Sequence, residues 1–152
     1  MILTEIFLIA ISGLLATLGM ALFFHLIRIF KFSSANIVCL LESFFTESEK
    51  NESSSIAWFF HFLFGVIFAF IYALVLKIIP GIIKYSASYL AAGTVLGFVH
   101  GLIFSLIVII LVAEHHPVKK YREQGFGGAI YYFIAHIIYG LTFGLCYMTF
   151  IS

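Results

Sequence analysis

Residues 56–79 read IAWFFHFLFGVIFAFIYALVLKII, a run of apolar and aromatic residues in which Lys77 is the only charged residue. A helix crosses the hydrocarbon core of a bilayer with about 20 such residues, because its backbone rises about 1.5 Å per residue. Comparable runs give four predicted spans, at about residues 2–30, 56–79, 85–112 and 129–151. The sequence therefore predicts an all-α integral membrane four-helix bundle, a single transmembrane domain over residues 1–152.

The composition supports the same class of protein. Hydrophobic residues make up 63% of the chain and charged residues 10%, whereas a soluble domain has roughly 45–50% and about 25%. Too few polar side chains are present to cover a particle in water, and eight Lys and Arg are too few to meet a nucleic-acid backbone. Soluble, disordered and nucleic-acid-binding proteins are excluded, and the expected partner is the lipid bilayer.

The positive charges predict an orientation. Six cations flank the first and third connections, at Arg28, Lys31, Lys50, Lys119, Lys120 and Arg122. Lys77 and Lys84 flank the second connection, which the Pro80-Gly81 pair marks as a tight turn. Because cytoplasmic loops carry the excess of Lys and Arg, we expect loops 1 and 3 in the cytoplasm and both termini outside.

Two features stand out in those loops. Residues 35–45, ANIVCLLESFF, are apolar enough to form a short helix at the membrane interface. In the third loop, the glycine-rich residues 125–128 are expected to be a flexible connection before the last span.

An offset of 75 residues pairs His25 with His100 and His61 with His136. Glycine, phenylalanine and tyrosine also match around the second pair. The offset predicts two tandem helical hairpins, residues 1–77 and 78–152, in the same orientation. Their pseudo-two-fold axis then follows the membrane normal.

Small residues recur at helical spacing beside the histidines. In lipid, glycines spaced by four residues let two helix backbones approach closely. We therefore expect helix-packing seams at Gly65, Gly93, Gly97, Gly101, Gly140 and Gly144.

The histidines themselves suggest a site. An imidazole in hydrocarbon must be hydrogen-bonded or ligated, and imidazole is the commonest metal ligand. His61, His100 and His136, with His25 as a fourth, are candidate ligands of haem b or a transition metal. The alternative is that they are packing histidines with satisfied hydrogen bonds.

Glu114, His115 and His116 form a second candidate metal group, for zinc, iron or copper. Adjacent residues on a helix point about 100° apart, so a solvated polar loop is the alternative. No phosphate-binding loop, nucleophile elbow or His-Glu-x-x-His pair is present, which favours a chain without intrinsic enzymatic activity.

Residues 93–101, GTVLGFVHG, and 136–144, HIIYGLTFG, resemble small bacterial four-helix membrane proteins of unknown function. Those proteins are similar in carrying His-x-x-aromatic-Gly-x-x-x-Gly in the last span. The resemblance implies a multi-pass protein of the bacterial inner, or cytoplasmic, membrane and transfers no activity.

Three functions remain open at this point. The first is a redox or metal-handling protein with haem or a transition metal at the intramembrane histidines. The second is a structural or accessory subunit that packs through its glycine seams against other membrane subunits or against itself. The third is a small transporter or channel, which is disfavoured because no proline interrupts a predicted span.

Overall fold

The computed structural model describes residues 2–33, 35–46, 54–78 and 86–151, which are helical almost throughout and contain no strand. Four of its helices are long and apolar enough to cross a membrane. The predicted all-α four-helix architecture of a multi-pass membrane protein is confirmed. In chain order the elements are α1 (Ile2–Ile29), α2 (Ile37–Thr46), α3 (Ser55–Ile78), α4 (Ser86–Ile107), the π-helix η1 (Val108–Val112), α5 (Ala113–His115), α6 (Lys119–Arg122) and α7 (Gly125–Phe150).

The helix bounds follow the apolar runs closely. The third span continues from α4 without a break through η1 into α5, where the Ala113 N–H bonds the Val108 carbonyl and makes one π turn. The Pro80-Gly81 turn, Lys50 and Lys84 lie outside the described residues.

The prediction of a flexible connection at residues 125–128 is wrong, because α7 begins at Gly125. Gly125 has φ +51°, a left-handed conformation that glycine adopts at little cost. The Gly128 N–H then bonds the Gln124 carbonyl at 3.0 Å, so the glycines form the first turn of the helix. Helix α7 therefore begins four residues before the predicted span.

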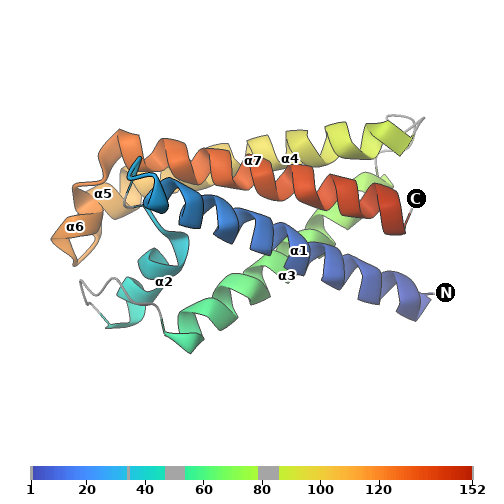
Figure 1. Cartoon of the computed structure of the whole chain (residues 1–152), viewed down its shortest axis with the longest axis horizontal. Coiled ribbons are helices and arrows are strands. Elements are labelled where there is room, and N and C mark those ends of the chain that lie inside the picture. Colours follow the sequence, from blue (N-terminus) through green and yellow to red (C-terminus); the bar gives the residue numbers. More distant parts are fainter. Residues whose placement is uncertain (1, 34, 47–53, 79–85, 152) are drawn as a thin grey trace.

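Helices α4 and α7 lie side by side along most of their length (Figure 1). Their backbones touch: a Cβ on Gly97 would lie 2.5 Å from the His136 carbonyl oxygen, and one on Gly93 would lie 2.8 Å from the Cα of Gly144. Close approach of this kind is the reason small residues favour helix association in lipid.

Helix α3 packs against α1 in a similar way. A Cβ on Gly13 would lie 2.7 Å from the Cβ of Ala69, and Thr17 occupies the space beside Gly65. Near its C-terminal end α3 lies close to α4. Followed back towards its N-terminal end, α3 runs obliquely and moves away from α4 (Figure 1). The two helices therefore enclose a wedge that widens towards α2.

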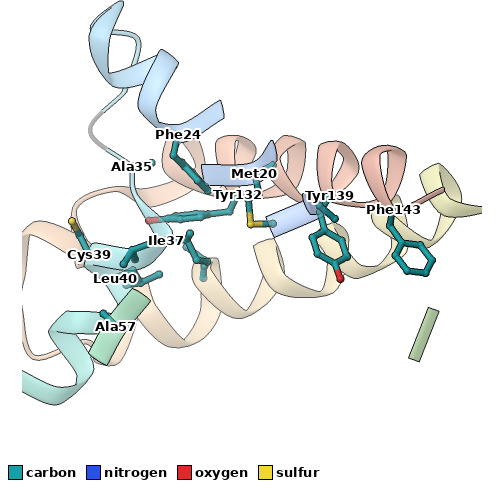
Figure 2. Close-up of a cluster of buried hydrophobic side chains, with 14 of the residues drawn as sticks. Met20, Phe24, Ala35, Ile37, Cys39, Leu40, Ala57, Tyr132, Tyr139 and Phe143 are labelled. Carbon is teal, nitrogen blue, oxygen red and sulfur yellow. The ribbon is translucent and has the colours of Figure 1, made fainter. Parts of the chain in front are cut away.

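Helix α2 closes the wide end of this wedge. Asn36 caps it, accepting the Val38 N–H at 2.9 Å. The helix predicted within residues 35–45 therefore forms, but it packs into the bundle, with Ile37 and Leu40 almost fully buried. Figure 2 shows these α2 side chains in one cluster with Phe24 and Tyr132.

The ends of the bundle differ. Helices α2, α5 and α6 gather at one end, and both termini lie at the other (Figure 1). The described parts of the first and third connections thus share an end of the molecule, and the side of the membrane that this end faces stays a prediction.

Candidate functional site

A cavity of about 480 Å³ lies in the wedge between α3 and α4. Its walls are apolar and aromatic, and its polar groups come from three histidines, two tyrosines and a threonine. The described lining residues are Thr17, Met20, Ile37, Leu41, His61, Phe64, Gly65, Phe68, Ile71, Tyr72, Val75, Leu96, Val99, His100, Ile103, Phe104, Ile107, His136 and Tyr139.

His61 of α3 is the unusual group in this cavity. The residue is 6% exposed, and its Nε2 has no hydrogen-bond partner in the described part of the chain. Its ring makes an edge contact with Trp58, with ring centroids 6.1 Å apart. A buried polar atom without a partner costs roughly 1–3 kcal/mol, so this nitrogen is a natural point for a ligand to bind.

His100 of α4 faces α3 across the wedge. Its Nδ1 lies 3.2 Å from the Tyr72 hydroxyl, and its ring stacks on Phe68 with centroids 3.9 Å apart. His100 thus joins α3 to α4 through a hydrogen bond and an aromatic contact.

His136 of α7 lies at the back of the cavity. Its Nδ1 is 2.6 Å from the Tyr132 carbonyl, which can only accept, so Nδ1 donates and Nε2 of the neutral ring carries the lone pair. The His136 and His100 rings meet edge to face with centroids 4.5 Å apart. The cavity therefore offers a hydrogen-bond acceptor at His136 Nε2, beside the unpartnered His61 Nε2.

The Tyr139 hydroxyl stabilises this arrangement. It donates to the Gly65 carbonyl at 2.5 Å and so ties α7 to α3 beside the cavity. Thr17 of α1 occupies the space that a side chain at position 65 would need, so glycine at this position lets α1 and α3 pack closely.

The cavity opens sideways, towards the outer surface of the bundle. Several lining side chains are also among the exposed apolar residues: Phe64, Ile71, Val99, Ile103 and Ile107. In a membrane-spanning bundle this surface faces lipid, so the mouth of the cavity between α3 and α4 opens towards the bilayer.

The structure brings together three of the four predicted intramembrane histidines. His61, His100 and His136 line one cavity, whereas His25 is exposed on α1 and does not line it. The 75-residue repeat stays a prediction, and its paired positions 25 and 100 have different surroundings.

The Glu114, His115 and His116 group is not assembled. The side chains of Glu114 and His115 are about 70% exposed, whereas His116 is 2% exposed and turned into the bundle. Across the described residues, no three His, Cys, Asp or Glu side chains lie close enough together to hold a metal ion.

His116 instead fastens α2 to the third connection. The Val118 N–H donates to its Nδ1 at 3.1 Å, so Nε2 carries the proton and donates to the Ser43 hydroxyl at 3.1 Å. Burial lowers the pKa of His116 below its ordinary value of 6.5. The lower pKa favours the neutral ring, which is the form that these two hydrogen bonds require.

Sequence reasoning missed the contribution of α2 to the cavity. Ile37 and Leu41 line its wide end, and the only signal was the apolar face of residues 35–45. That pattern fits both a helix on the membrane surface and a helix packed against the bundle.

Comparison of the chain with protein-family models, curated proteins and solved structures finds no match. The resemblance to bacterial four-helix membrane proteins therefore stays a prediction.

Proposed function

We propose that this chain is a membrane protein that binds a lipid-soluble molecule in the cavity between α3 and α4, with the polar end of that molecule at the histidines. The observation that carries the proposal is the buried His61 Nε2, which has no partner among the described residues and lies at an apolar cavity. A ligand atom bound to this nitrogen removes the cost of leaving it unpaired.

The cavity suits a molecule that arrives from the bilayer. Its volume of about 480 Å³ lies within the usual range of small-molecule sites, and its mouth is bordered by exposed apolar side chains such as Val99 and Ile103. A long apolar chain can extend through this mouth into lipid while the head stays inside.

Haem b and transition metals have weaker support as ligands. The His100 and His136 rings are in contact, which leaves no room for a macrocycle between them. None of the described lining residues is a cation that could bind a haem carboxylate. Haem or metal binding through His61 is therefore the alternative that the experiment below also tests.

We also propose that the chain resides in a bacterial inner membrane, with the end that carries α2, α5 and α6 in the cytoplasm. Arg28, Lys119, Lys120 and Arg122 at this end support that orientation.

The proposal is tested by analysing what the purified full chain carries. We expect lipid mass spectrometry to find one neutral lipid in near-stoichiometric amount in the wild type and in His25→Phe, and about tenfold less in His61→Phe. His25→Phe is the matched control because it makes the same change on an exposed histidine outside the cavity. Circular dichroism verifies that both variants keep their helices.

Other results contradict the proposal. Equal amounts of lipid in His61→Phe and wild type would show that His61 does not bind the lipid, which contradicts the observation on which the proposal rests. A Soret band or a stoichiometric metal lost in His61→Phe favours the haem or metal alternative. Stoichiometric co-purification of a larger subunit, with an empty cavity, favours an accessory subunit.

A further inference from the structure

We propose that the ligand is a prenylated quinone or its quinol: an uncharged six-membered ring with oxygens on opposite sides and a long apolar tail. The inference rests on the proposed function and specifies its ligand class. Three properties of the cavity support it: the absence of Asp, Glu, Lys and Arg among its described lining residues, its histidine side chains and its aromatic walls.

The first property concerns the charge of the head group. None of the described residues that line the cavity is Asp, Glu, Lys or Arg. An unpaired charge in such surroundings is very costly, whereas a carbonyl or hydroxyl needs only a hydrogen bond. Carboxylate and phosphate head groups are therefore disfavoured, which leaves neutral lipids.

The second property concerns the polar groups of the cavity. His61 Nε2 has no hydrogen-bond partner among the described residues, and the rings of His100 and His136, which also line the cavity, meet with centroids 4.5 Å apart. A quinone ring carries two oxygens, and each needs a hydrogen-bonding partner in an apolar site. We place one oxygen at His61 Nε2 and the other at the His100–His136 pair.

Both oxidation states find partners there. When the Tyr72 hydroxyl donates to His100 Nδ1, the neutral His100 ring carries its proton on Nε2 and can donate to a quinone carbonyl. His136 Nε2 carries a lone pair and can accept from a quinol hydroxyl.

The third property is the aromatic wall. Phe64, Phe68 and Phe104 line the cavity, and Phe104 lies 4.7 Å from the His136 ring, centroid to centroid. Aromatic side chains pack favourably against a planar ring in offset or edge-to-face geometry. A flat head group thus fits these walls, and the tail leaves past Val99 and Ile103.

Trp58 is the only tryptophan of the chain and touches His61, so it reports on this site. The experiment titrates decylubiquinone, whose ring quenches tryptophan fluorescence, into the purified full chain in detergent micelles. We expect saturable quenching in the wild type and in His25→Phe. In His61→Phe the apparent Kd should rise about tenfold, and His61→Gln, which restores a hydrogen-bonding group, should recover part of the affinity.

Competition distinguishes the head group. Decylbenzene, which lacks the oxygens, and decanoate, which is charged, should leave the saturable quenching unchanged. Displacement by decanoate, linear quenching without saturation, or equal Kd values in His61→Phe and wild type would each overturn the quinone assignment. The proposed function is decided separately: a different neutral lipid that co-purifies in a His61-dependent way preserves it, whereas an empty cavity overturns both.

Discussion

Gly140 sets the distance between α4 and α7. A Cβ at this position would overlap the Gly93 carbonyl oxygen and lie 2.7 Å from the Cα of Gly97, and these backbone atoms cannot move aside individually. We expect Gly140→Ala to lower the free energy of unfolding by about 1–3 kcal/mol, the usual cost of overpacking. The measurement is reversible unfolding in mixed detergent micelles.

Gly127 provides the matched control for this substitution. It lies on the same helix, and a Cβ there meets nothing within 4 Å. Gly127→Ala should leave stability unchanged or raise it by about 0.4–1 kcal/mol through the unfolded state. Equal destabilisation by both variants would show that the contact between α4 and α7 does not depend on the absence of a side chain.

Helix α2 is held in place by a neutral histidine, so its docking should depend on pH. The folded pKa of His116 is lowered by burial, and protonation of Nδ1 would set two donors, Nδ1–H and the Val118 N–H, against each other. The docked state binds fewer protons than the released state, so docking is complete above the ordinary pKa of 6.5 and weakens as pH falls below it.

The test is hydrogen exchange of the α2 amides between pH about 8 and about 5, expressed as protection factors. We expect protection to fall at the acidic end in the wild type and in His115→Gln, a change at the exposed neighbouring histidine. In His116→Gln, protection should be reduced at every pH and lose its dependence on pH. An unchanged pH dependence in His116→Gln would assign it to another group.

Features of the helices and the site were predictable where they depend on residues close together in the sequence, and not where they depend on contacts between distant segments. The four spans were predictable because length and apolarity are local properties of segments such as residues 56–79. The glycine stripes of α4 and α7 marked surfaces suited to close packing, but not which helices meet there. The divergence of α3 from α4 was not predictable, because it is a relation between whole helices, as is the contact of α3 with α1, where Ala69 meets Gly13 and Thr17 lies beside Gly65. The histidine cavity lies between the diverging helices α3 and α4 (Figure 1).

At the scale of the whole molecule, the charges predict a direction in the membrane. We expect alkaline phosphatase fused after residue 152 to be active, and a green fluorescent protein inserted after residue 50, in the first connection, to fluoresce. Each reporter works on one side of the membrane only. The reverse pattern contradicts the orientation, and Lys119→Glu with Lys120→Glu should weaken the preference if these cations determine it.

The arrangement of the helices also predicts the route by which a ligand enters. Val99 lines the cavity and is 49% exposed, which places it at the lateral mouth between α3 and α4. Val95, one turn earlier on α4, is 61% exposed and is not among the lining residues. Val99→Trp therefore obstructs the mouth, while Val95→Trp adds the same side chain to the outer surface of the same helix.

We expect the amount of co-purifying lipid, measured by mass spectrometry, to fall several-fold in Val99→Trp and to be unchanged in Val95→Trp. Full occupancy in Val99→Trp would mean that the ligand enters elsewhere, and the end closed by α2 would then be the route to examine, since Ile37 and Leu41 form that wall of the cavity.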